Sequence, residues 1–345
     1  MLIRRGWLVA SVSAAALVLA LGAALGFEHW RRGPLPGLRA DTVVIVPQGA
    51  GLNAVARLLE ARGVLSGPLL LVVLGRLQGA SPRLKAGEYR LRAGSSPQDV
   101  LELIVTGRVV AHRVTLLEGW TFQQAVEAVR AHEAVARTPT GGDPAALAVA
   151  LGHPDGGLEG RLFPDTYTFP RGTTDVELLR RAAAALDERL RRAWQERAEG
   201  LPLASPAEAL VLASLVEKET AVDDERPLVA GVFVNRLRLG MRLQTDPAVI
   251  YGMGAAFDGN LRRQDLRRDT PYNTYTRAGL PPTPIALPGA ASIVAATRPA
   301  STGALYFVAS GQGDGRHRFA STLAEHNRNV ASYLATLRSS GEDRP

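Results

Sequence analysis

The stretch SPAEALVLASLVEKETAVDDER, residues 205–226, decides much of what this 345-residue sequence predicts. Ser205, Pro206 and Glu208 have the order of a helix N-terminus: a capping hydroxyl, a proline in the first turn and an acid at its third position. An apolar run follows, and it holds two glutamates one residue apart. We therefore predict a helix that carries two acids within an apolar sequence.

The two acids, Glu217 and Glu219, do not face the same way, because residues two apart lie on different sides of a helix. Glu219 falls in the apolar arc of Leu212 and Leu215, and Glu217 falls outside it. A carboxyl on that arc loses water, which raises its pKa towards the range of a general acid. The position equally suits a buried acid paired with an arginine such as Arg236. Glu217 is expected to support the site or to lie on the surface.

An uncharged N-terminal segment, Trp7 to Phe27, is long enough to cross a bilayer. A cleaved signal peptide is the alternative, although its apolar core would span only about 7–15 residues. We expect a retained single-pass anchor in the cytoplasmic (inner) membrane, with a tail at residues 1–6, the transmembrane helix at 7–27 and a linker at 28–41. Arginines before the segment favour an N-terminus inside and a periplasmic or extracytoplasmic body, although arginines also follow it.

The rest of the chain predicts two domains of class α+β. Residues 42–135 read as a small α+β module whose strand–helix–helix–strand order resembles a LysM module, a binder of sugar polymers. A packing domain without a ligand is the alternative. Residues 136–345 are expected to form a larger mixed α+β catalytic domain.

Two further segments are interpreted from their length and their turn residues. GPLLLVVLGRL, residues 67–77, is too short to span a bilayer and is expected to be a buried helix. LEGRLFPDTYTFPRGTT, residues 158–174, is interrupted by glycine and proline too often to predict a regular element.

Composition argues against several classes of site. The net charge is +7, but the arginines are scattered and no basic run alternates with aromatic residues, so we expect no nucleic-acid partner. There is no cysteine, which excludes disulfides and thiolate metal sites. His317 and His326 lack metal-ligand spacing with any acid, and no phosphate-binding glycine motif occurs. Neither a metal nor a cofactor is expected.

The sequence resembles the endolytic murein transglycosylase family, the MltG-like (YceG-like) proteins. The resemblance rests mainly on LASLVEKETAVDDERPLVAGVFVNRLRLGMRLQTDPAVIYGMG at residues 212–254 and PYNTYTRAGLPPTPIALPG at 271–289. LEGRLFPDTYTF, LYFVASG and HRFASTLAEHN match in order, so the resemblance covers essentially the whole chain. It implies a membrane-anchored enzyme that cuts peptidoglycan glycan strands internally and leaves 1,6-anhydro-muramyl ends.

The matching catalytic residue is the second acid of the E-K-E-T motif, Glu219. A lytic transglycosylase uses the muramyl 6-hydroxyl as nucleophile, so one carboxyl can first protonate the leaving oxygen and later accept the hydroxyl proton. A glycosidase that hydrolyses the bond needs two carboxylates. Glycan-positioning groups are predicted among the polar residues Gln244, Asp246, Tyr272, Asn273 and Tyr275, with Glu159 and Asp165 as weaker candidates.

The expected substrate is the peptidoglycan glycan strand, with termination or trimming of nascent strands as the role. The resemblance also implies penicillin-binding proteins of the elongation machinery as partners. Two rivals stay open: a lysozyme-type hydrolase of the same bond and a non-catalytic peptidoglycan-binding scaffold. A pyridoxal-phosphate lyase is disfavoured, because it needs a Schiff-base lysine and the chain has only Lys85 and Lys218.

Overall fold

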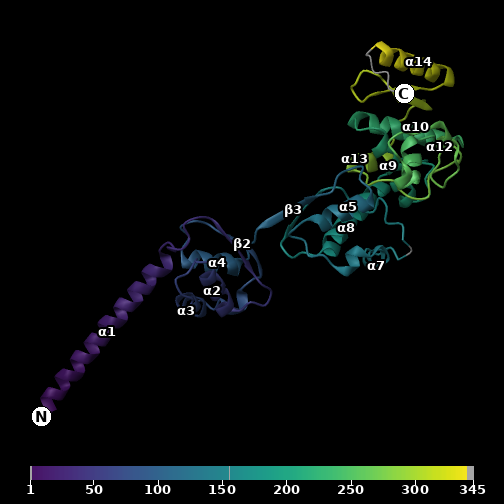
Figure 1. Ribbon diagram of the computed structural model, residues 1–345. Coiled ribbons are helices and arrows are strands. Elements are labelled where there is room, and N and C mark those ends of the chain that lie inside the picture. Colours follow the sequence, from purple (N-terminus) through teal and green to yellow (C-terminus); the bar gives the residue numbers. More distant parts are fainter. Residues whose placement is uncertain (1, 155, 340–345) are drawn as a thin grey trace. The chain divides into compact units, whose positions relative to one another are not determined.

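The computed structural model describes residues 2–154 and 156–339, with residues 2–12 described by their backbone alone, and its class is mixed α+β (Figure 1). The chain forms two compact units. The first contains the described residues up to His112 together with Thr168–Gly172, and the second contains Arg113–Tyr167 and the described residues from Thr173 onward. The division falls within β3 (Ala111–Thr115) and β4 (Thr166–Pro170), which pair with each other. The expectation of no regular element at residues 158–174 was therefore wrong.

The first unit is built on a two-stranded antiparallel sheet in which Val44 lies opposite Tyr89. Both side chains are fully buried at 0% exposure, together with Leu59, Leu71 and Ile104 from the surrounding helices. The elements of this unit are α1 (Leu2–Arg32), β1 (Thr42–Val46), α2 (Leu52–Ala61), α3 (Leu69–Leu77), η1 (Ser81–Arg83), β2 (Gly87–Leu91) and α4 (Pro97–Thr106).

Local sequence signals set the ends of α4. The Ser96 side chain accepts a hydrogen bond from the Asp99 amide, and the Asp99 carboxylate accepts one from the Ser96 amide, which closes the capping box. Gly107 ends the helix in the left-handed region with φ 72°. Both ends follow from the sequence, because each depends only on neighbouring residues.

The apolar N-terminal helix continues directly into the first unit. Its segment Ser13–Arg32 is long and apolar enough to cross a membrane, and none of its most apolar window is buried. Met1 of the expected tail lies outside the described residues, and residues 2–6 belong to α1. The segment expected as a linker is largely ordered, because Leu35 and Leu38 are 4% and 2% exposed in the core of the unit.

The expected module ended at residue 135, whereas the first unit ends at His112. The reason is that α5 (Phe122–Ala131) packs against α8 (Asp175–Gln195) of the second unit. The likeness of the expected module, residues 42–135, to a LysM module stays a prediction. In the same unit α3 is only half buried, contrary to expectation: Leu71 is 0% exposed but Leu77 is 72% exposed.

The second unit surrounds one central helix, α9 (Pro206–Glu219), which packs against α8, α10, α11 and α13. All residues from Ala209 to Val216 are buried, so this part of α9 is buried on every side rather than along one stripe. The expected catalytic domain included Asp155 and residues 340–345, which lie outside the described residues. The remaining elements are α6 (Pro139–Gly142), α7 (Pro144–Ala150), η2 (Asp223–Glu225), α10 (Arg226–Arg238), α11 (Asp246–Met253), η3 (Gly254–Ala256), α12 (Arg263–Arg267), α13 (Ala290–Thr297), β5 (Tyr306–Ala309), β6 (His317–Ala320) and α14 (Leu323–Ser339).

Candidate active site

Helix α9 begins as its sequence predicts and ends at a cleft. The Ser205 hydroxyl accepts a hydrogen bond from the Glu208 amide at 3.3 Å, while the Glu208 carboxylate accepts one from the Ala204 amide at 2.6 Å. At the other end the helix opens into a cleft of about 680 Å³. One wall of this cleft is the segment Glu118–Trp120, and the other includes residues 217–221. Both glutamates of the helix therefore line the same space.

Glu219 is a half-buried carboxyl in this cleft, at the last residue of α9. Burial raises its pKa from 4.5 to about 7, and the nearby negative charge of Asp246 adds to the rise. The Thr245 hydroxyl and the positive charge of Arg236 oppose it. At neutral pH the carboxyl is thus poised to give up a proton and to take one back.

The Thr245 hydroxyl lies beside the Glu219 carboxyl. It is close enough to lower the pKa of Glu219, yet Thr245 Oγ1 is buried without a hydrogen-bond partner of normal geometry among the described residues. The Thr245 amide is fixed by Thr274 Oγ1 at 2.9 Å. This oxygen is closed to solvent, so its effect is on the Glu219 carboxyl itself rather than on the open part of the cleft.

Gln244, the residue before, has φ 53°, the only positive φ outside glycine among the described residues. A side chain in this region is disfavoured and persists only where the surroundings impose it. The Gln244 backbone amide donates to the Thr274 carbonyl at 3.2 Å, and the side-chain oxygen Gln244 Oε1 accepts from Arg236 at 3.3 Å. The strained backbone therefore presents Gln244 and Thr245 beside the carboxyl.

Asp246 and Tyr275, both predicted site residues, form a pair next to Glu219. The Tyr275 hydroxyl donates a 2.5 Å hydrogen bond to Asp246 Oδ1. Burial is the main cause that raises the pKa of Tyr275 above its ordinary value of 10.0, and the Asp246 carboxylate and Glu219 add to it. The phenol thus stays a proton donor that orients a carboxylate near the candidate acid.

Arg236 is not the ion-pair partner that the sequence left open for Glu219. Its guanidinium donates to the carbonyls of Leu305 at 2.6 Å and Leu243 at 2.8 Å, and it lies 5.2 Å from the centre of the Tyr306 ring. No ion pair with Glu219 exists among the described residues. Arg236 therefore holds loops together and acts on Glu219 only through its charge.

Glu217 is a buried support, since its side chain is only 6% exposed. Its Oε2 accepts hydrogen bonds from the Gly289 amide at 2.9 Å and the Ser292 hydroxyl at 2.7 Å. The Arg226 guanidinium lies 3.7 Å from Oε1. The surface role considered for Glu217 does not hold, because its oxygens are occupied by the protein.

The wall Glu118–Trp120 was missed by sequence reasoning. Two backbone hydrogen bonds fix it to Leu287: the Gly119 amide donates at 2.9 Å, and the Leu287 amide donates to the Trp120 carbonyl at 2.7 Å. Burial, followed by the charge of Glu217, raises the pKa of Glu118. The acid and the tryptophan of this segment gave no local signal, because only the fold brings them to the cleft of Glu219.

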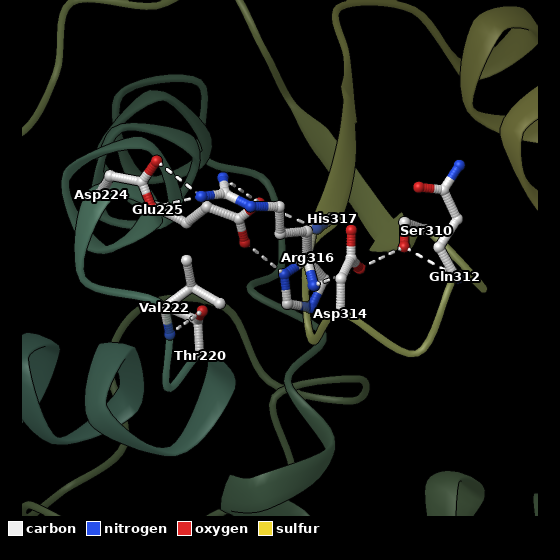
Figure 2. A network of polar contacts seen from close by, with 9 residues as sticks. All are labelled: Thr220, Val222, Asp224, Glu225, Ser310, Gln312, Asp314, Arg316 and His317. Carbon is white, nitrogen blue, oxygen red and sulfur yellow. Dashed lines mark hydrogen bonds and ion pairs between the residues drawn. The ribbon is translucent and has the colours of Figure 1, made fainter.

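The segment that follows Glu219 is fastened to the β5–β6 hairpin, as Figure 2 shows. Arg316 donates to both oxygens of Asp224 at 3.1 and 3.0 Å. Glu225 is 3% exposed and accepts hydrogen bonds from the His317 amide at 2.9 Å and from His317 Nδ1 at 2.8 Å. We call these two residue pairs the hairpin latch. They hold the segment that follows Glu219 against the hairpin.

Comparison with known proteins identifies the family of this chain. The model of the YceG-like family matches residues 44–332. This protein belongs to the YceG-like family. The resemblance predicted from the motifs is thereby confirmed.

Relatives and a solved structure of the family agree with this placement. The chain is 30% identical over 311 residues to the endolytic murein transglycosylase of Bacillus subtilis, covering 84% of each. It is 29% identical over 359 residues to the Streptococcus pneumoniae protein of the same name, covering 92% of this chain but spanning only 63% of that protein's length. A crystal structure of a YceG-like protein from Listeria monocytogenes has TM-score 0.53 and 29% identity, with 84% of this chain and 99% of that one covered.

Asn273 and Tyr272 have structural contacts in this YceG-like fold. Asn273 is 0% exposed, and its Nδ2 donates to three backbone carbonyls, including that of Arg268 at 2.7 Å. Its Oδ1 accepts from the Tyr275 amide at 2.9 Å, so Asn273 shapes the loop that carries Tyr275. The Tyr272 hydroxyl contacts Thr283 Oγ1 at 2.8 Å.

The contacts of the two weaker candidates, Glu159 and Asp165, do not include Glu219. Glu159 accepts hydrogen bonds from the Phe122 amide at 2.8 Å and the Tyr251 hydroxyl at 3.1 Å, and burial raises its pKa. Asp165 is exposed and lies 3.9 Å from Arg189. The described residues include no group of three acids or histidines placed to hold a metal ion.

Proposed function

We propose that this protein is an endolytic lytic transglycosylase. It would cleave the MurNAc–GlcNAc glycosidic bond within peptidoglycan glycan strands and leave 1,6-anhydroMurNAc ends. The observation that carries the proposal is Glu219, whose pKa is raised to about 7 in an open cleft. The names of the Bacillus and Streptococcus relatives support the choice of murein as substrate.

In the first step, Glu219 gives its proton to the bridging oxygen as the bond from that oxygen to the muramyl C1 breaks. Positive charge develops at C1, and the Asp246 carboxylate, oriented by Tyr275, is the nearby group that stabilises it. In the second step, the muramyl 6-hydroxyl oxygen bonds to C1 and its proton passes to the Glu219 carboxylate. Glu219 ends protonated as it began, and no water is consumed.

The remaining groups of the cleft would position the glycan. The side-chain amide of Gln244, which is exposed, is suited to sugar hydroxyls. The Trp120 ring on the opposite wall is suited to the apolar face of a pyranose. Helix α1 would anchor the enzyme, with its body outside the cytoplasm. Termination of nascent strands beside penicillin-binding proteins is proposed from the family resemblance.

The test is digestion of purified sacculi by the full-length protein in detergent, with products identified by mass spectrometry. We expect anhydro-ended fragments from the wild type and none from Glu219→Gln. A lysozyme-type hydrolase would release fragments heavier by one water. Because Glu118 lines the same cleft, Glu118→Gln is the variant that would then lose activity.

A non-catalytic scaffold predicts a different result from the same material. It would bind sacculi without releasing soluble products, and its binding would survive Glu219→Gln. Soluble anhydro-ended fragments from Glu219→Gln at the wild-type rate would remove Glu219 from the mechanism.

A further inference from the structure

Helix α3 presents an apolar stripe that none of the described side chains of the first unit covers. Leu69, Leu70, Val73 and Leu77 are 71%, 42%, 38% and 72% exposed. Their spacing places them along one side of the helix, because residues three, four and seven or eight apart share a face. The opposite side, with Leu71 and Leu74, is buried in the core of the unit. We call the four exposed residues the α3 stripe.

Within the first unit, α1 is joined to the remaining elements without free chain between them. The Gly33 amide donates to the His29 carbonyl at 2.8 Å, and the Leu35 amide donates to the Ser95 carbonyl at 3.0 Å. Phe27 and Trp30 of α1 pack against the same core as the buried side of α3. The α3 stripe therefore belongs to a body held against whatever surface α1 enters.

Helix α1 itself calls for a lipid environment. Leu17, Leu19 and Leu21 are 73%, 74% and 61% exposed, and the segment Ser13–Arg32 has the length and composition of a membrane span. In Figure 1, α3 lies on the side of the first unit towards which α1 extends. Two uncovered apolar surfaces, α1 and the α3 stripe, thus belong to one unit.

We propose that the α3 stripe rests in the interface of the bilayer that α1 spans, so that the first unit lies on the membrane surface. This rests on the proposed membrane anchor. An amphipathic helix inserts its apolar face at the boundary of headgroups and acyl chains while basic residues reach the headgroups. Arg76, exposed between Val73 and Leu77, is placed for such a contact with anionic lipid.

The contact has a consequence for the enzyme. Helix α1 alone would leave the tilt of the first unit against the bilayer unset, whereas a second contact fixes its orientation. Lipid is the occupant of the stripe; a second copy of the chain, or the second unit, would be a protein occupant.

The absence of cysteine permits single-site labelling of the full-length protein. We would place an environment-sensitive fluorophore on Leu69→Cys, Leu77→Cys, Leu21→Cys or Ala111→Cys, and reconstitute each into phosphatidylethanolamine–phosphatidylglycerol vesicles with or without brominated lipid. Leu21 reports on the anchor, and Ala111, exposed where the chain leaves the first unit, is the aqueous control.

We expect a blue-shifted, bromine-quenched signal at Leu69, Leu77 and Leu21, and an unshifted, unquenched signal at Ala111. Labels at Leu69 and Leu77 that stay open to aqueous iodide while Leu21 is quenched would overturn the proposal and leave the anchor intact. A blue shift without bromine quenching would also overturn it, because the stripe would then lie against protein. Quenching at Leu77 but not at Leu21 would keep the lipid contact and overturn the anchor.

Discussion

The Ser292 hydroxyl donates a 2.7 Å hydrogen bond to Glu217, two residues before Glu219 on α9. This bond and the one from the Gly289 amide join the last turn of α9 to the beginning of α13. The candidate acid is therefore placed by its neighbour, whose oxygens are used within the fold.

Replacing Glu217 by Ala should destabilise the protein by about 2–4 kcal/mol, because it leaves the Gly289 amide and the Ser292 hydroxyl without their acceptor and removes the negative charge beside the buried Arg226. Glu217→Gln should cost less, since it keeps one acceptor oxygen. Thermal unfolding measures both. Lys218→Ala, an exposed neighbour, is the control and should change little; equal loss in all three variants would contradict the assignment.

Glu219→Gln should change stability in the opposite direction, and only at higher pH. The folded state raises the pKa of Glu219 from 4.5 to about 7, so unfolding free energy falls as pH rises across that interval. The neutral amide removes this loss. We expect the variant to be more stable than the wild type by about 1–3 kcal/mol at pH 8 and little changed at pH 4. Melting curves at the two pH values decide it, and a gain that is the same at both would refute the raised pKa.

Gln244→Gly should separate backbone strain from side-chain function. Glycine accepts φ 53° without penalty, so stability should hold or rise by up to about 1 kcal/mol. Loss of the Gln244 side-chain amide should raise KM about two- to tenfold if that amide binds glycan. Gln244→Ala, which keeps the strained backbone, is the matched control and should show the same KM. Wild-type KM in both variants would show that the amide contacts no substrate.

Trp120→Ala should weaken glycan binding about tenfold, or about 1.4 kcal/mol, through KM rather than kcat. The physical reason is the loss of an aromatic surface in the cleft opposite Glu219. Intrinsic fluorescence of the Glu219→Gln protein, titrated with purified glycan strands, gives an independent measurement. Adding Trp120→Phe should abolish the fluorescence change, and Trp194→Phe should not; the reverse pattern would place the binding surface elsewhere.

In the hairpin latch, the interaction energy should be larger for the Glu225–His317 pair than for the Asp224–Arg316 pair. Side chains of Glu225 and His317 are 5% and 14% exposed, whereas those of Asp224 and Arg316 are 66% and 48% exposed. Double-mutant cycles with alanine should give about 1–3 kcal/mol for the buried pair and under about 1 kcal/mol for the exposed one. Similar coupling at the two pairs would mean that burial does not set their strength.

Several features could be predicted because they depend on neighbouring residues. The N-terminal cap of α9, the capping box of α4 and the apolar length of α1 follow from short-range geometry and composition. The family was likewise readable from its motifs, and the choice of Glu219 over Glu217 came from them as much as from the helical face. That face was a weak guide, since α9 is buried on all sides.

Only the tertiary structure decided how the polar side chains are used. Asn273 looked like a sugar ligand, yet its amide is consumed by backbone carbonyls. Trp120 had no signal, yet it lines the cleft of Glu219, 99 positions further along the chain. A local pattern fixes which residues can form a helix or cap it. Whether a carboxyl is dry, paired or open to a ligand depends on groups that long-range packing brings within a few ångströms, and no spacing along the chain records them.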